Sequence, residues 1–242
     1  MFASSENNLP TLYLIPNFIG NTSWVTQFPD INKSIICQLK YFIAEDARAC
    51  RQLLKLAGYS DISSAIIEEY NEHHFDKDVS YLLQPLYEGH SIGLVSEAGM
   101  PAIADPGDII VRMAHQKNFN IVPLVGASSI MLAVVASGLS GNNFAFIGYL
   151  PIEAHDRVRR IKEIEQFSFT KRQAQFFIEA PYRNQKLFSL LIQILNSDTL
   201  LVIACNLMET KPLIKTKPVS EWKKSDLPDI QKKPCVFGIM KV

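Results

Sequence analysis

Short apolar runs alternate with amphipathic segments along the first 150 residues. Apolar runs bounded by Gly, Pro or Asn are typical of buried strands, whereas apolar residues three and four apart predict helices. The pattern predicts five strands, at 11–15, 41–44, 92–95, 121–124 and 144–149. It predicts four helices between them, at 48–56, 79–87, 109–115 and 130–136. Strands that alternate with helices indicate a mostly parallel sheet.

The remaining residues repeat this alternation. The pattern predicts a charged helix at 157–166 and an amphipathic helix at 184–195. It predicts strands at 175–179, 200–205 and 235–241, and a solvated loop or edge hairpin at 211–217. We therefore expect two α/β domains, residues 1–148 and 149–242, joined by a hinge near Gly148–Pro151.

Composition narrows the class of protein. With 242 residues and 48% hydrophobic content, the chain can form two well-packed cores. The four cysteines have no CxxC spacing, which favours buried thiols over a disulfide or a zinc site. Residues 1–8 are polar and acidic, unlike a signal peptide, and the apolar stretch near 130–137 is too short to cross a bilayer. We expect a soluble cytoplasmic protein with no membrane partner and no metal.

The net charge of zero conceals an asymmetry between the two halves. Residues 1–150 contain 8 Lys and Arg against 14 Asp and Glu, whereas residues 151–242 contain 16 against 10. A basic domain is a candidate for binding polyanions. The alternative is a dipolar surface with no functional consequence.

The loops that follow two predicted strands are unusually rich in small residues. The strand at 92–95 ends in Ser96-Glu97-Ala98-Gly99, and the loop continues to Gly107. A second loop, Gly126–Ser129, follows the strand at 121–124. Such loops let a ligand approach the backbone closely, at the edge where α/β proteins place ligands. The alternatives are an ordinary strand-to-helix connection and, for the two serines, a helix N-cap.

Six segments, in order, resemble the tetrapyrrole methylase superfamily of S-adenosyl-L-methionine (SAM)-dependent methyltransferases. They look most like the branch that methylates a cytidine ribose 2′-hydroxyl in small-subunit ribosomal RNA. The resemblance covers roughly residues 10–190. The segments are LYLIPNFIGN (12–21), FIAEDARACRQLL (42–54), LVSEAGMPAIADPG (94–107), VPLVGASSIMLAVVASGL (122–139), FAFIGYLP (144–151) and FFIEAPYR (176–183).

The resemblance implies two unlike α/β domains with SAM in the cleft between them, an RNA substrate in the small ribosomal subunit, and a homodimer. It also places the cofactor contacts. These would be Gly99, Met100, Ile103, Ala104, Ser128 and Ser129 in the first set of loops, and Ala180, Leu207 and Pro234 in the second domain, next to Glu179.

The chain departs from the branch at five places. It has Glu97 where the branch has Asp, Met100 where it has Thr, and Asn17-Phe18 where it has Thr-Pro. Residues 125–127 replace Pro-Gly-Pro, and residues 206–210 replace Arg-Glu-Leu-Thr-Lys. These departures affect the identity of the substrate more than the fold or the cofactor.

A ribose hydroxyl is a poor nucleophile, so a nearby base would assist methyl transfer. The first candidates are Glu97 and Glu179, because both close strands that face the expected cleft. Each candidate carboxylate could instead cap a helix or pair with Arg48, Arg51 or Arg183. The full set is Glu45, Asp46, Glu97, Asp105 and Glu179.

Basic residues after the hinge are candidates for contacts with RNA phosphates. They are Arg157, Arg159, Arg160, Lys171 and Arg172. The adjacent His73 and His74 indicate a surface pair rather than a metal site, and His73 is a further candidate for contact with RNA. Two other functions stay open: methylation of a tetrapyrrole-like small molecule, and RNA or ribosome binding by a degenerate, non-catalytic member.

Overall fold

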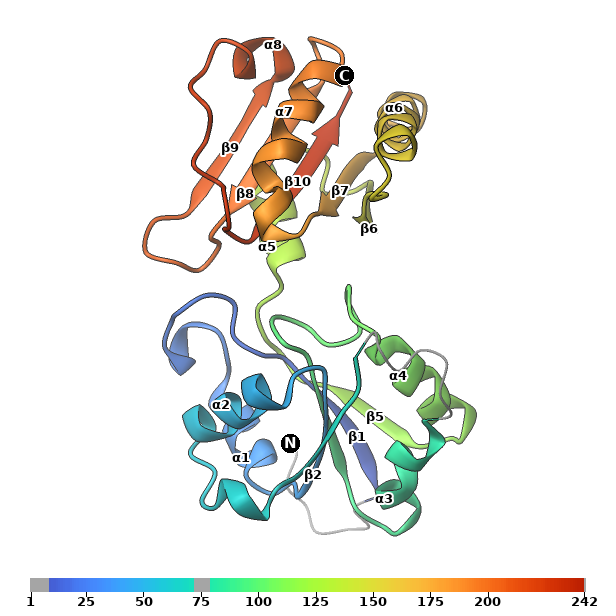
Figure 1. The fold of residues 1–242 in the computed structure, drawn as a ribbon. Helices are drawn as coiled ribbons and strands as arrows, with labels where there is room; N and C mark the ends of the chain where they lie inside the picture. Colours follow the sequence, from blue (N-terminus) through green and yellow to red (C-terminus); the bar gives the residue numbers. More distant parts are fainter. Residues whose placement is uncertain (1–8, 72–78, 242) are drawn as a thin grey trace. The chain divides into compact units, whose positions relative to one another are not determined.

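The computed structural model describes residues 9–71 and 79–241 (Figure 1). It divides into two compact units, residues 1–128 and 129–242, and each contains its own five-stranded sheet. The prediction of two α/β domains is therefore confirmed. The boundary expected between residues 148 and 149 stays a prediction. Helix α5 (Ser129–Ser137), which precedes that boundary, packs on the sheet of the second unit.

The first unit is built on a fully parallel sheet, in agreement with the apolar pattern. The strand order is β3-β2-β4-β1-β5. The central strand β4 is buried along its whole length, as expected for a parallel strand covered on both faces. The strands are β1 (Thr11–Ile15), β2 (Tyr41–Ala44), β3 (Ile66–Glu69), β4 (Ile92–Val95) and β5 (Asn120–Pro123).

Helices cover both faces of this sheet. Helices α1 (Asp30–Ile36) and α2 (Ala47–Ala57) pack on one face, through a core that includes Ile15 and Val95. Helices α3 (Gln84–Tyr87) and α4 (Gly107–Gln116) contribute to a separate core. The loops after the neighbouring strands β1 and β4 therefore lead to opposite faces. This arrangement places a ligand site at the carboxyl ends of those strands.

The second unit has a mixed sheet with the order β6-β7-β10-β8-β9. Only β6 and β7 are parallel, and the other pairs are antiparallel, so the expected parallel arrangement holds for the first unit alone. The strands are β6 (Phe144–Tyr149), β7 (Ala174–Ile178), β8 (Leu200–Cys205), β9 (Leu213–Pro218) and β10 (Cys235–Met240).

Helix α5 packs against one core of this unit, with Phe176 and Val202. The other core receives side chains from the remaining helices and from Phe177, Ile203 and Phe237. Neighbouring residues of each strand thus belong to different cores, as the two-residue period of a strand requires. The remaining helices are α6 (Ala154–Lys171), α7 (Asn184–Ile194) and α8 (Val219–Trp222).

The segments 79–87 and 211–217 show how the predicted and observed secondary structure compare. The helix expected at 79–87 is a 3-10 turn, Ser80–Leu83, followed by the single-turn α3. Pro85 explains the difference, because it lacks the N–H that a continuous α-helix needs at that position. For residues 211–217 we expected a solvated loop or an edge hairpin, and the structure has the hairpin: β9 pairs with β8 at the edge of its sheet.

Within the described ranges, no helix has the length and apolar character needed to cross a bilayer. The same residues contain no group of three or more His, Cys, Asp or Glu side chains placed to hold a metal ion. All four cysteines carry free thiols, three of them buried and Cys37 exposed.

Candidate functional site

The loop after β4 is joined to the loop after β1 through Asn17. The amide N–H of each of Asn17 and Gly99 donates to the carbonyl of the other, at 2.8 and 3.1 Å. The Asn17 side-chain amide also donates to the carbonyls of Ser96 and Glu97, both at 3.0 Å. Asn17 is buried and stands where the branch has threonine, which has no amide to make this pair of bonds. The departure at position 17 thus adds two side-chain bonds to the backbone link between the two loops.

The same loop has a strained backbone. Gly99, Ala102 and Ala104 have positive φ angles of 74°, 64° and 62°. For the two alanines, this left-handed conformation costs roughly 1–2 kcal/mol per residue. The carboxylate of Asp105 stabilises it by accepting from the amides of Ala102 at 2.9 Å and Gly107 at 2.7 Å. Backbone outliers that the surrounding structure holds in place are typical of ligand sites.

The loop after β5 meets the other two at Gly99 and Gly126. A Cβ on Gly99 would lie 3.6 Å from Ile19 and 3.9 Å from the Ala127 carbonyl. A Cβ on Gly126 would lie 2.3 Å from the ring of Pro16, so only glycine allows this approach. The structure therefore brings the predicted residues of the first unit to the carboxyl end of its sheet. Gly99 is buried, Met100 half-buried, and Ile103 and Ala104 exposed; Ser128 precedes α5, and Ser129 is its first residue.

Four carboxylates gather beside this loop. Glu45 follows β2, and its carboxylate accepts from the Glu97 amide at 2.8 Å. Burial raises the pKa of Glu45, and the negative charges of Asp105, Glu97 and Asp46 raise it further, against the lowering effect of the Glu97 amide. Burial also raises the pKa of Asp105. Asp46 is the N-cap of α2. Helix capping was one of the alternatives to catalysis expected for these carboxylates.

The raised pKa of Glu45 predicts a pH-dependent change in stability. Ionisation is less favourable in the folded state, so stability falls as pH rises from the ordinary value of 4.5 through the folded-state pKa. Glu45→Gln retains an acceptor for the Glu97 amide but not the charge. We expect it to raise the free energy of unfolding at pH 7.5 by roughly 0.5 kcal/mol, since half-exposed charges are screened. Near pH 4.5 this gain should shrink.

Urea denaturation across that range measures the effect, and Glu68→Gln on the exposed β3 is the control. If Glu45→Gln has the same effect at both ends of the range, the repulsion among the carboxylates is not its cause.

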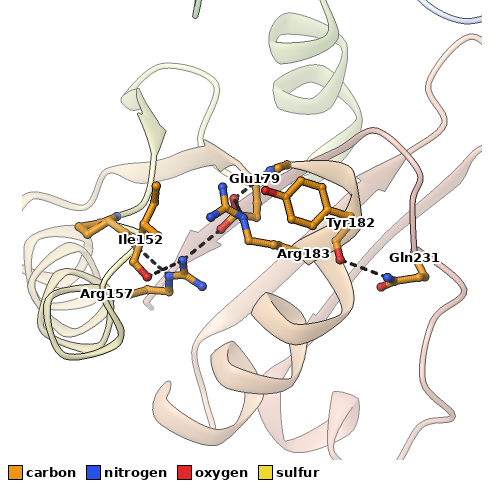
Figure 2. A network of polar contacts seen from close by, with 8 residues as sticks. Ile152, Arg157, Glu179, Tyr182, Arg183 and Gln231 are labelled. Atoms are coloured by element: carbon orange, nitrogen blue, oxygen red, sulfur yellow. Dashed lines mark hydrogen bonds and ion pairs between the residues drawn. The ribbon is translucent and has the colours of Figure 1, made fainter.

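In the second unit, Glu179 lies directly after β7 in a buried ion-pair network (Figure 2). Its side chain is 1% exposed and lies 2.9 Å from Nε of Arg183 and 3.7 Å from a terminal nitrogen of Arg157. Arg157 also donates to the carbonyls of Pro151 at 2.7 Å and Ile152 at 3.0 Å. The network thus connects the end of β7 to the segment that leads into α6. The ion pair between Glu179 and Arg183 is one of the alternatives to a catalytic role that the sequence analysis left open for Glu179.

The predicted cofactor residues of the second unit also converge. Strand β10 is antiparallel to β7 and β8, so its first residues lie beside the last residues of both strands. Asn206 donates to the Pro234 carbonyl at 3.0 Å, which places Leu207 next to this junction. Leu207 is buried, Ala180 is half-buried and Pro234 is exposed. Asn206 and Met208 have positive φ angles, so this loop also has a strained backbone.

The basic residues expected to contact phosphates differ in whether a carboxylate of the protein already pairs with them. Arg157 is engaged by Glu179, and Arg159 forms ion pairs with Asp156 and Glu163. Arg160 also pairs with Glu163. Lys171 and Arg172 are exposed at the end of α6. His73 lies outside the described residues, and the proposed contacts of all these residues with RNA stay predictions.

Sequence comparison gives relatives that share one name. No protein-family model matches the chain. A protein of Vibrio cholerae named ribosomal RNA small subunit methyltransferase I is 31% identical over 89% of this chain and 71% of its own length. Its namesake from Escherichia coli O157:H7 is 30% identical over 92% of this chain and 75% of its own length. A third, from Halalkalibacterium halodurans, is 35% identical over 72% of this chain and 56% of its own length.

The chain belongs to the ribosomal RNA small subunit methyltransferase I family. The resemblance to this branch of the tetrapyrrole methylases is therefore confirmed, and it extends over more of the chain than residues 10–190. This methyltransferase I family member has altered residues in the loops after β1, β4 and β5. The three loops nevertheless contact one another, through the bonds of Asn17 and the close approach of Gly126 to Pro16.

Sequence analysis missed three contributions to these sites. The Asn17 amide, the bond from the Glu97 amide to Glu45, and the pairing of Arg157 with Glu179 all join residues far apart in the chain. The asparagine two residues after the first strand was the one available signal, since Asn side chains often bond to backbone groups.

Proposed function

We propose that the protein is a SAM-dependent methyltransferase that methylates a ribose 2′-hydroxyl in small-subunit ribosomal RNA. The observation that carries this proposal is the pair of methyltransferase I relatives, of whose length the chain covers 71 and 75%. The chain spans little more than half of the third relative. The ribose position comes from the motif resemblance, and the basic composition of residues 151–242 agrees with a polyanionic substrate.

The residues present fit SAM. In the first unit, the strained loop at 99–104 offers backbone groups and small side chains to an adenosine. The negative charges of Asp46 and Asp105 beside Glu45 suit a ligand that carries a sulfonium and an ammonium. We propose that Gly99, Met100, Ile103, Ala104 and Ser128 bind SAM in the first unit, and Ser129, Ala180, Leu207 and Pro234 in the second.

When bound, SAM supplies an activated methyl group, so the protein's task is mainly to position the hydroxyl and to take its proton. We propose Glu97 as the base. Its side chain is exposed beside the loop, and it forms no ion pair among residues 9–71 and 79–241, whereas Glu179 is compensated by two arginines. Glu45 fixes the Glu97 backbone through its amide and thereby positions this residue.

The test is transfer of a labelled methyl group from SAM to total RNA and to isolated small ribosomal subunits. We expect label in small-subunit RNA, in a linkage resistant to alkali. Glu97→Gln should lower kcat by about 100-fold or more without changing the affinity for SAM. Bound SAM with no labelled RNA would instead favour a tetrapyrrole-like small molecule as substrate. Absence of SAM binding in calorimetry would favour a non-catalytic RNA-binding member.

The superfamily resemblance also supports a cytoplasmic homodimer. Sedimentation velocity over a range of protein concentrations measures the assembly state, and a monomer at all concentrations would contradict this part of the proposal.

A further inference from the structure

A pocket of about 700 Å³ in the second unit is lined by basic side chains. Strand β9 forms one wall, and the segment from Trp222 to Lys233 forms the other. The charged residues that line it are Lys211, Lys215, Lys217, Lys224, Lys233, Asp226 and Asp229. Five lysines against two aspartates give the pocket a net positive charge.

Two of these lysines are held by the protein itself. Lys217 donates to the Ser225 hydroxyl at 2.6 Å and lies 5.1 Å from the centre of the Trp222 ring. Lys233 forms an ion pair with Asp229. Among the described residues, Lys211, Lys215 and Lys224 form no ion pair, and all three are exposed. These three therefore provide uncompensated charge that an anionic ligand can neutralise.

The strand geometry aligns the lysines of β9. Lys215 lies opposite Ile203 and Lys217 opposite Leu201, so both project on the face of the sheet where those apolar residues pack. Alternate residues of a strand are about 7 Å apart, comparable to the distance between successive phosphates of an extended nucleic-acid strand. Two lysines at this spacing, with Lys211 on the same wall of the pocket, suit a polymer of phosphates better than a single small anion.

The pocket adjoins the loop that we propose as a cofactor wall. Asn206 lines the pocket, and the next residue is Leu207. Lys233 lines it too and precedes Pro234. An RNA strand held by the lysines would thus pass directly beside the 206–208 loop. This adjacency lies wholly within the second unit.

We propose that this lysine pocket binds the phosphodiester backbone of the RNA substrate next to the modified nucleotide. The inference rests on the proposed function, because it takes RNA as the substrate. It differs from the earlier prediction, which assigned phosphate contacts to α6, where Arg157, Arg159 and Arg160 are already paired with carboxylates. Lysines on an edge strand also prevent edge-to-edge association, but that role predicts no effect on RNA binding.

The test compares two triple variants of the full chain. One, Lys211→Ala with Lys215→Ala and Lys224→Ala, removes the unpaired pocket charges. The control removes three exposed lysines elsewhere: Lys55, Lys117 and Lys186, each changed to alanine. Binding to transcribed small-subunit ribosomal RNA is measured by filter binding between 50 and 200 mM salt. We expect the pocket variant to bind about 10-fold more weakly, with a salt slope shallower by about 2, since each single-strand phosphate contact contributes about 0.7.

Methyl transfer by the same variants separates the two proposals. The pocket variant should raise KM for RNA while kcat and the affinity for SAM remain within twofold of wild type. Equal salt slopes for both variants would overturn the pocket proposal even if the wild type methylates RNA. A pocket-dependent slope without any methylation would overturn the proposed function, and the pocket would then be an RNA-binding site with no modified nucleotide beside it. Weaker binding to assembled subunits, with binding to naked RNA unchanged, would overturn the pocket proposal in favour of an acidic ribosomal protein as the partner.

Discussion

Replacing Glu179 with alanine is expected to lower the free energy of unfolding by about 3 to 5 kcal/mol, because it leaves buried charges without their partner. The carboxylate is 1% exposed, and the side chains of Arg157 and Arg183 are 12% and 23% exposed. Neither guanidinium can recover full hydration without moving the segment that it holds. Urea denaturation monitored by circular dichroism measures the loss.

Arg159→Ala is the matched control, because Arg159 lies on α6 beside Arg157 and its side chain, which pairs with Asp156 and Glu163, is 60% exposed. We expect a cost below about 1 kcal/mol for it. A similar small cost for Glu179→Ala would contradict the buried network. Glu179→Gln keeps an acceptor for the two guanidinium groups but loses the charge, so it should cost less stability than Glu179→Ala. Loss of methyl transfer by Glu179→Gln at a temperature where it is still folded would assign the predicted catalytic role to Glu179 in place of Glu97.

Gly99→Val is expected to weaken SAM binding by about 10-fold. A valine at a φ of 74° is strained by roughly 1–2 kcal/mol, and the loop relieves that strain by leaving the conformation that its two backbone bonds with Asn17 hold. SAM binding has to restore the strained conformation, and a cost of roughly 1–2 kcal/mol is about one factor of ten in affinity. Isothermal titration calorimetry with SAM provides the measurement.

Gly58→Val is the control for backbone strain. Gly58 has a φ of 85° at the C-cap of α2, and a Cβ there would meet open space. It lies outside the predicted cofactor loops. Both variants should lose similar stability, but only Gly99→Val should lose affinity for SAM. Undiminished affinity in Gly99→Val would show that SAM is bound elsewhere.

The buried strands were predictable because their own sequence identifies them. Strands β1, β2 and β4 have the predicted bounds, and each is a continuous apolar run between turn residues. Strand β3 was missed because its sequence, IIEE, is polar in half of its positions and largely exposed at the edge of the sheet. Helix α1 was missed because its seven residues, DINKSII, present only a short apolar stripe.

The candidate site was predictable to the level of loops but not of contacts. Resemblance and small-residue composition selected the loop at 96–107, and the structure shows that its backbone is strained and held by Asp105. The bond between Glu45 and the Glu97 amide depends on how β2 and β4 align in the sheet. Sequence spacing carries no information on that register, since the two residues are far apart along the chain.

The position of β10 constrains the order in which the protein can fold during synthesis. All five strands of the first sheet have been synthesised by Pro123, so that unit can fold while later residues are still being added. The second sheet has β10 between β7 and β8, so those two strands lack a shared neighbour until residues 235–240 have left the ribosome. Until then β7 and β8 each expose an unpaired edge. We therefore expect chaperone binding and aggregation mainly while the second unit is still incomplete.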